Sequence, residues 1–393
     1  MAEIHWNKLG AYLKETQILG SIQNTLYWDQ NTGMPKKGAS WRSEQLTYIA
    51  KVLHERNSSE EFSNLIQSAK NELADIERNS DNQLFIKDKE RNISLLLKEF
   101  NRERNLDPKL VESLAKAKSK GYESWQEAKE KSDFKIFLPF FEELVKLRIE
   151  EAKQISDQYS PWETLAQPFE PELTLKWLNK MFQPLKDTLP ELIRGINKSK
   201  KYHWDLSPES QHNLCSQLLD EFGRDKDLVV VGKSPHPFSI TLGPNDYRIT
   251  TRIVEGEPLS SFLATAHEWG HSIYEQGLPS QSHQWFAWPL GQATSMGIHE
   301  SQSLFWENRI VKSKSFSKRF FNKFVSAGCS LNNYLELWKS INHLEAGLNR
   351  VEADELTYGL HILIRTELEI DLIERGLPAE DIPTEWNKRY DEL

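Results

Sequence analysis

One segment of the sequence defines both ends of a helix and what that helix presents on one face. It runs from Pro258 to Gly277. Proline suits the first turn of a helix and glycine suits the position after its last turn, so the two residues predict where this helix begins and ends. Within it, His267 and His271 lie four positions apart, which places them on one face about 6 Å apart along the axis. The chain must therefore fold around a helix that presents two imidazoles together.

Two imidazoles placed in this way can bind one metal ion. Glu268 follows His267 directly and lies about 100° around the helix from it, close to such an ion without being a ligand. The pattern is HExxH, which is typical of zinc peptidases. A pair of hydrogen-bonded structural histidines is the alternative, and a third ligand would decide between the two. Gly270 costs the helix about 1 kcal/mol relative to alanine, which predicts close approach by another element.

Three places could supply the third ligand. A third histidine ten residues after the first is ruled out, because that position is glycine. Glu275 lies about 12 Å along the helix from the first histidine, too far for one ion with bonds of about 2 Å. Glu300 lies in a second predicted helix, after a loop long enough to turn back, and is the favoured ligand. Glu307, about two turns further on, is the less favoured candidate. Three protein ligands leave a fourth position open to water, which is typical of catalytic zinc.

The chemistry expected of such a site is hydrolysis. Zinc lowers the pKa of bound water towards about 7 and polarises a carbonyl group. Glu268 would take the proton of the water and return it to the leaving amine. Donors for the oxyanion are also needed, and the sequence leaves the choice open among His236, Arg248, His299 and Tyr358.

The rest of the chain predicts a mostly α-helical protein, because apolar residues recur at helical spacing over most of its length. The segments 228–232, 238–242 and 247–253 differ, since they are rich in β-branched residues and separated by turn formers. They predict a small antiparallel β-sheet. We expect a mainly helical region over 1–225 and a region over 226–393 that holds the sheet and the metal-binding helices, the two forming one catalytic unit.

Composition excludes several classes of protein. No stretch approaches twenty consecutive apolar residues, which argues against a membrane span, and the N-terminus has no secretory signal. Two cysteines rule out a disulfide framework and fit a reducing cytoplasm. The chain carries 58 acidic and 49 basic side chains, a net charge of −9, which argues against nucleic acid as the main ligand. We expect an acidic, globular, cytoplasmic protein.

Several longer motifs follow one another along the chain. They are the N-terminal signature from Tyr27 to Pro35, HPF at 236–238, DxRxT at 246–250, HExxH at 267–271, HESQ at 299–302 and an arginine–acid motif from Arg350 to Tyr358. Together they resemble the carboxypeptidase Taq family of thermostable-type metallocarboxypeptidases, which are gluzincins. Members of that family continue beyond the point where this chain ends, so we expect a member that lacks the usual C-terminal segment.

The resemblance implies a fold, an activity and a metal. The fold would be a helical gluzincin fold with a deep active-site cleft, commonly in a homodimer. The activity would be the release of single residues from free peptide C-termini with broad specificity. The metal would be zinc, with cobalt as a substitute. His267, His271 and Glu300 would be its ligands, and Glu268 the general base.

The resemblance also points to residues that would bind the substrate. Arg248 and Arg350 lie in motifs associated with substrate binding, and an arginine can hold a terminal carboxylate bidentately. Each could instead form an internal ion pair. His299 and Tyr358 are further candidates, and His236 is either a substrate contact or a packed histidine. Two other functions remain open: an oligopeptidase of the same clan, and a homologue that binds metal but is catalytically impaired.

Overall fold

The structure is a computed structural model that describes residues 3–76, 83–156, 158–195, 202, 204–345, 347–348, 350 and 353–392. Positions 351 and 352 of the arginine–acid motif therefore lie outside the described residues. The chain forms two compact units, and each is built from two separate segments. The first unit comprises 1–98 and 199–343, and the second comprises 99–198 and 344–393. The boundary expected between 225 and 226 falls inside the first unit.

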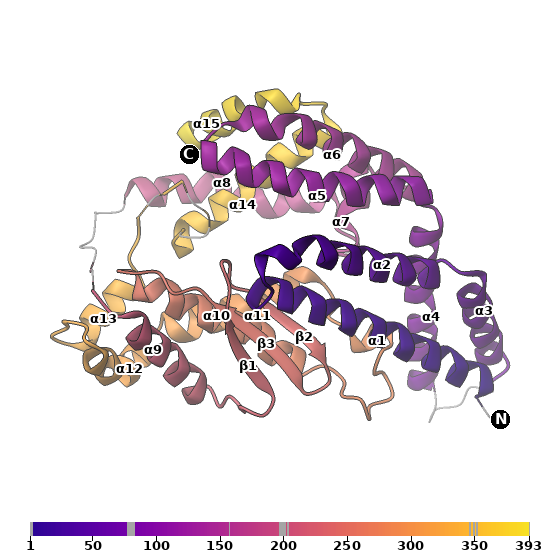
Figure 1. The fold of residues 1–393 in the computed structure, drawn as a ribbon, viewed down its shortest axis with the longest axis horizontal. Coiled ribbons are helices and arrows are strands. Elements are labelled where there is room, and N and C mark those ends of the chain that lie inside the picture. The colour runs from indigo at the N-terminus through magenta and orange to yellow at the C-terminus, as the bar shows by residue number, and fades with distance from the viewer. Residues whose placement is uncertain are drawn as a thin grey trace. The chain divides into compact units, whose positions relative to one another are not determined.

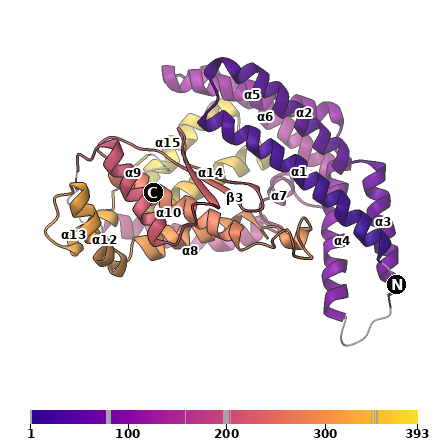
Figure 2. The same cartoon turned by 60° about the horizontal axis from the view of Figure 1, so that its bottom comes forward.

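The first unit contains a group of long N-terminal helices and the helices that surround the sheet. They are α1 (Ile4–Thr32), α2 (Ala39–Asn57), α3 (Glu60–Ala74), α4 (Gln83–Arg104, which continues into the second unit), α9 (Pro208–Glu221), α10 (Pro258–Gln276), α11 (Met296–Leu304), α12 (Lys314–Ala327) and α13 (Tyr334–Ile341). A π-helix, η3 (Phe305–Val311), continues α11 directly. Helices α1 and α2 lie side by side, as Figures 1 and 2 show. The mostly helical fold expected from the sequence is confirmed.

All regular secondary structure in the described part of the second unit is helical. Its helices are α5 (Pro108–Lys131), α6 (Phe134–Ile155), α7 (Pro161–Ala166), α8 (Leu175–Arg194), α14 (Glu355–Glu374) and α15 (Ile382–Glu392). Helices α5 and α6 form a hairpin whose turn contains Ser132 in the left-handed region, with φ of 53°. The side chain of Asp133 then accepts a hydrogen bond from the Lys135 backbone and caps α6. Within this unit α14 packs against α6, α7 and α8.

The small sheet is mixed rather than antiparallel. Its strands are β1 (Val229–Lys233), β2 (Ser239–Gly243) and β3 (Asp246–Thr251), in the order β1-β3-β2. Strands β2 and β3 form the expected antiparallel pair, whereas β1 runs parallel to β3. The loop after β1 explains the correction: Ser234 Oγ lies 2.6 Å from Thr250 Oγ1, and the Phe238 N–H donates to that same hydroxyl. The loop therefore crosses the end of β3, and β2 enters on its other side.

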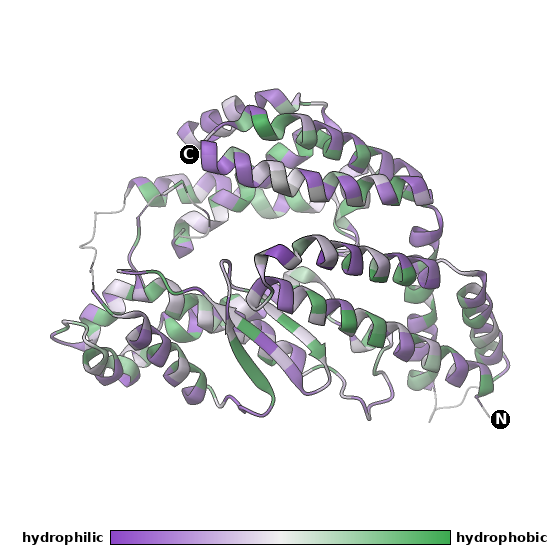
Figure 3. Cartoon of the chain, in the orientation of Figure 1, coloured by the Kyte–Doolittle hydropathy of each residue, from purple (hydrophilic) through white to green (hydrophobic). Residues whose placement is uncertain are grey.

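The core of the first unit fixes helix α10. Phe262 and Ala266 on one side of α10 pack into a cluster that includes Phe320 and Phe324 of α12. Trp269 packs with residues of α9 and the sheet on another side. Burying one such side chain contributes about 1.5–3 kcal/mol, so α10 is held on two sides. Figure 3 shows hydrophobic stretches in the small sheet beside hydrophilic ones, and long helices along which hydrophobic and hydrophilic segments alternate.

None of the helices in the described part of the chain combines the length and the apolar character that a membrane crossing needs.

Candidate metal centre

Helix α10 has the ends that the sequence predicted. It begins with Pro258 in its first turn and ends at Gln276, and Gly277 caps it by donating its N–H to the carbonyl groups of Ile273 and Tyr274. The helical spacing brings the ring centroids of His267 and His271 to 5.0 Å from each other. The first element of the site therefore follows from local sequence.

Helix α11 lies directly against α10. A Cβ atom at Gly270 would lie 2.4 Å from Cα of Ser303 and 2.6 Å from the carbonyl oxygen of Gln302. No side chain fits at these distances, so the close approach expected from this glycine is confirmed. Ser295 caps the start of α11 by accepting a hydrogen bond from the Ile298 N–H. The contact between the two backbones carries Glu300 to the face of α10 that bears the histidines.

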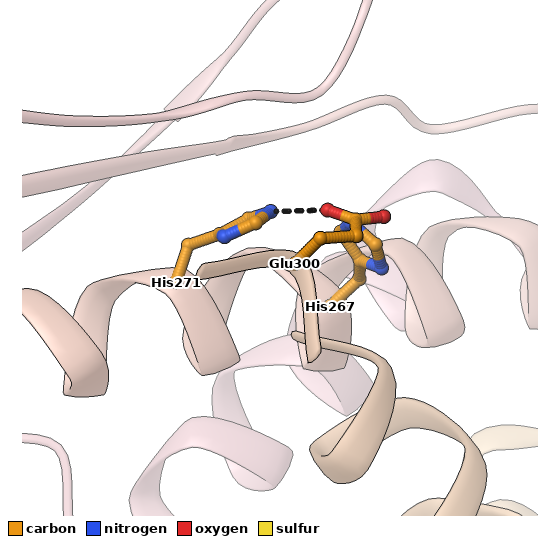
Figure 4. Close-up of side chains that lie close together, drawn as sticks. All are labelled: His267, His271 and Glu300. Atoms are coloured by element: carbon orange, nitrogen blue, oxygen red, sulfur yellow. Dashed lines mark ion pairs between the residues drawn. The ribbon is translucent and has the colours of Figure 1, made fainter. Parts of the chain in front are cut away.

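Three side chains converge where the helices meet. The potential ligand atoms of His267, His271 and Glu300 all lie within 4.8 Å of one another, and Figure 4 shows both rings turned towards the carboxylate. Glu300 Oε2 is 3.2 Å from His271 Nε2 and 3.6 Å from His267 Nε2. These contacts outweigh the effect of burial and lower the pKa of Glu300 to about 2.

These three residues fit a divalent metal ion. Two bonds of 2.0–2.1 Å at the tetrahedral angle place their outer atoms about 3.3–3.4 Å apart, and the two histidine Nε2 atoms lie 3.2 and 3.6 Å from Glu300 Oε2. Two imidazole nitrogens and one carboxylate oxygen are also a typical donor set of a catalytic zinc site. Each ring keeps its second nitrogen for another partner.

Glu268 is buried beside these residues, with 7% of its surface exposed. Burial raises its pKa to about 7; the nearby His267 opposes this shift, and the carboxylates of Glu300 and Glu307 add to it. A carboxyl group with such a pKa can both accept and return a proton near neutral pH. The arrangement therefore combines a place for a metal ion with a group suited to proton transfer.

Glu307 is not one of the three converging residues. It lies in η3, and its Oε2 is 3.0 Å from His267 Nδ1, on the side of the ring away from Glu300. Its other carboxylate oxygen is 3.3 Å from Lys312 Nζ. Burial raises the pKa of Glu307, but the hydrogen bond to His267 and the charge of Lys312 outweigh it and leave that pKa below its usual value.

His299 occupies the corresponding place behind the second histidine. Its Nδ1 is 2.7 Å from His271 Nδ1, and its Nε2 is 2.9 Å from Glu275 Oε1. Both ring nitrogens of His299 are therefore engaged within the protein. Sequence reasoning considered Glu275 and Glu307 only as metal ligands and missed these outer contacts. The available signal was spacing, since Glu275 follows His271 by one further helical turn.

Two other predicted substrate contacts lie in the first unit. Arg248 on β3 donates from Nε and Nη2 to the two carboxylate oxygens of Asp246, at 2.8 and 2.9 Å, and its guanidinium lies 5.4 Å from the ring centroid of Trp28. This is the internal ion pair that the sequence allowed for this arginine. His236 is exposed in the loop between β1 and β2, and its carbonyl accepts a hydrogen bond from Ser234.

The remaining two candidates, Arg350 and Tyr358, belong to the second unit. The structure brings them to each other: Arg350 Nη1 donates to the Tyr358 hydroxyl at 2.9 Å, and its guanidinium lies 5.7 Å from the tyrosine ring centroid. All the residues of the metal centre described above belong to the first unit.

Comparison with known proteins agrees with this geometry. The family model described as carboxypeptidase Taq (M32) metallopeptidase matches residues 8–393. A thermostable carboxypeptidase 1 of Thermus thermophilus is 33% identical over 405 residues, covering 99% of this chain and 78% of that relative. Among solved structures, a carboxypeptidase of Pyrococcus furiosus gives a TM-score of 0.89 at 28% identity, over 99% of this chain and 78% of the other. Metallocarboxypeptidase 1 of Trypanosoma cruzi gives 0.88 at 28% identity, over 99% and 77%. The chain therefore belongs to the carboxypeptidase Taq (M32) family of metallopeptidases, which are peptide hydrolases.

Proposed function

We propose that this protein is a zinc-dependent carboxypeptidase that releases single residues from the free C-termini of peptides, with broad specificity for the residue released. The observation that carries the proposal is the convergence of His267, His271 and Glu300 beside a buried Glu268, in a chain of the M32 family. The histidines and Glu300 would hold the ion, zinc with cobalt as a substitute. We further propose that the protein is cytoplasmic, which its two cysteines support, and that it forms a homodimer, which the family resemblance supports.

The roles of the side chains follow from their positions. A zinc ion bound here would polarise the scissile carbonyl and lower the pKa of the attacking water. Glu268 would accept a proton from that water and then donate it to the leaving amine nitrogen. The buried position of Glu268 beside the three ligands and its raised pKa in the metal-free protein support this role, because the group must be a carboxylate in one step and a carboxylic acid in the next. Glu300 stays ionised throughout, since its pKa is low.

We propose that the terminal carboxylate of the substrate is bound by an arginine, either Arg248 or Arg350. For Arg248 an incoming carboxylate would compete with Asp246, which holds both Nε and Nη2. Arg350 is hydrogen-bonded to the hydroxyl of Tyr358, and in this alternative the two side chains would receive the carboxylate together. The exposed His236 stays a candidate substrate contact.

A panel of paired peptides tests the proposal. Each pair has one sequence with a free C-terminus and the same sequence with a C-terminal amide. We expect single residues to be released from the free peptides only, with loss of activity on chelation and recovery with zinc. Glu268→Gln should retain bound zinc and lose at least about 1,000-fold in kcat. Amidated peptides cut as fast as free ones would indicate an oligopeptidase. Tight zinc binding without turnover of any peptide would indicate a catalytically impaired homologue.

A further inference from the structure

Each of the two histidines in the metal centre has one ring nitrogen that faces Glu300 and a second that faces an outer partner. In both rings Nε2 faces Glu300 and Nδ1 faces away from it. The outward nitrogens meet different partners, since His267 Nδ1 meets a carboxylate and His271 Nδ1 meets another imidazole. A neutral imidazole carries its single hydrogen on one nitrogen only, so the outer partner decides which nitrogen is left to bind a metal.

For His267 the outer partner is Glu307. A carboxylate can only accept a hydrogen bond, so the contact of 3.0 Å requires the hydrogen of His267 to lie on Nδ1. Nε2 is then left with its lone pair, facing Glu300. The ammonium group of Lys312, 3.3 Å from the second oxygen of Glu307, balances the charge of this buried carboxylate.

For His271 the position of the ring hydrogen is decided by a residue behind its direct partner His299. Only one hydrogen fits between two imidazole nitrogens 2.7 Å apart, and it belongs either to His271 or to His299. Glu275 decides between them, because its Oε1 accepts from His299 Nε2 and so places the hydrogen of His299 there. Nδ1 of His299 is then bare and must accept from His271. His271 therefore also carries its hydrogen on Nδ1 and leaves Nε2 free.

We propose that Glu307 and His299 are positioning residues that hold His267 and His271 in the tautomer that binds metal through Nε2. Glu307 does so directly, with Lys312 behind it, and His299 does so with Glu275 behind it. The proposal rests on the metal site of the proposed function. It gives His299 a role other than the substrate contact predicted from sequence, because both of its nitrogens are engaged in this chain of contacts.

Zinc affinity of the full chain, measured by competition with a chromophoric chelator, tests the proposal. Partners behind a metal-binding histidine are worth about 10- to 100-fold in affinity, and we expect losses in that range for Glu307→Ala and His299→Leu. Glu307→Gln and His299→Asn keep an oxygen that can accept from Nδ1, so each should recover a large part of the loss. Ser301→Ala, an exposed change on α11, is the matched control and should leave affinity unchanged.

A spectroscopic measurement reads the tautomers directly. In the zinc-loaded wild-type protein with ¹⁵N-labelled histidine, we expect His267 and His271 to carry hydrogen on Nδ1 and zinc on Nε2, and His299 to carry hydrogen on Nε2. Ligation of either histidine through Nδ1 would overturn the proposal even if a variant failed to fold. Equal zinc affinity of wild type, Glu307→Ala and His299→Leu would overturn it as well. Peptide cleavage is not part of either readout, so a failure of the proposed activity is distinguished from a failure of this inference.

Discussion

The two helices that build the metal centre obtain their geometry in different ways. Helix α10 is 19 residues long, is held on two sides by the core, and presents its histidines by helical spacing alone. Helix α11 has 9 residues and passes directly into the π-helix η3. Its Glu300 reaches the site only because the two backbones touch at Gly270. One half of the centre is thus encoded locally, and the other half depends on packing between helices.

The contacts also show how the second helix runs. His299, at its beginning, meets His271 and Glu275 in the C-terminal part of α10, whereas Glu307 meets His267 nearer its centre. Helix α11 and η3 therefore run back along α10 in the opposite direction. A single continuous stretch supplies one converging carboxylate and the outer partners of both histidines, so a small shift of this stretch disturbs the whole centre.

The largest expected effect comes from separating the two helices. Gly270→Ala places a methyl group against the backbone of Ser303 and should destabilise the protein by about 3 kcal/mol. Because Glu300 moves with α11, we expect zinc affinity to fall roughly 100-fold. Gly20→Ala is the matched control, since nothing lies within 4 Å of a Cβ at that position in α1, and it should be neutral or slightly stabilising. Chelator competition and thermal unfolding measure both, and equal behaviour of the two variants would refute the packing argument.

A second prediction concerns the charge of Glu268 on α10 and leaves the packing of the two helices unchanged. The raised pKa of Glu268 means that the metal-free folded protein keeps a proton that the unfolded chain releases above about pH 4.5. Its stability should therefore fall as pH rises from about 4.5 to about 7, with the full cost present above pH 7. Glu268→Gln removes this cost and should stabilise the metal-free protein at pH 8 by roughly 1–3 kcal/mol, with little gain at pH 4.5.

The two buried cysteines provide the measurement for that variant. Cys215 and Cys329 both lie in the first unit, so their labelling by a thiol reagent at increasing urea reports the opening of the unit that holds the site. A lower urea midpoint for Glu268→Gln than for wild type at pH 8 would contradict the expected sign.

A smaller effect is expected from the side chain that supports Glu300 within its own helix. Ser303 is fully buried and its hydroxyl contacts both the carbonyl and Oε2 of Glu300, at 2.7 and 3.2 Å. Ser303→Ala should cost about 1–2 kcal/mol and weaken zinc binding roughly fivefold. Ser301→Ala removes an exposed hydroxyl from the same helix and should change stability by less than about 0.5 kcal/mol. If the two alanine variants bind zinc equally, Glu300 does not depend on Ser303.

The smallest effect concerns how each helix begins. Helix α11 is capped by the buried Ser295, whereas Glu257 before α10 makes no side-chain cap. Ser295→Ala should cost about 1 kcal/mol and lower zinc affinity by no more than about threefold. Glu257→Gln should have almost no effect on urea midpoints. A larger loss for Glu257→Gln would mean that α10 also depends on its first turn.

The same contrast explains what sequence could predict. Pro258, Gly277 and the histidine spacing act over one or two turns, so the limits and the face of α10 could be predicted. Glu300 was reached by distance and elimination, and Gly270 predicted a neighbour without identifying it. The partnership of Glu307 with His267 depends on η3, where the hydrogen bonds follow the π pattern, and on contacts between residues 40 positions apart. Neither the π-helix nor the long-range contact leaves a signal in the local spacing of apolar residues.

The sheet was predicted only in part for a similar reason. Pro244 and Asn245, with φ of 64° at Asn245, form the tight turn that pairs β2 with β3, and turn residues of this kind are local signals. The parallel pairing of β1 with β3 depends instead on Ser234 and Thr250, which lie on different segments and meet only after folding.

The interleaved segments of the two units have a consequence for the order of events during synthesis. The last residue of the first unit, His343, is translated before the second segment of the other unit, 344–393. Every residue of the metal centre is therefore available while 99–198 still lack their partner segment. Since compact units generally fold as their residues emerge, the ribosome delivers both segments of the metal-binding unit before the other unit receives residues 344–393.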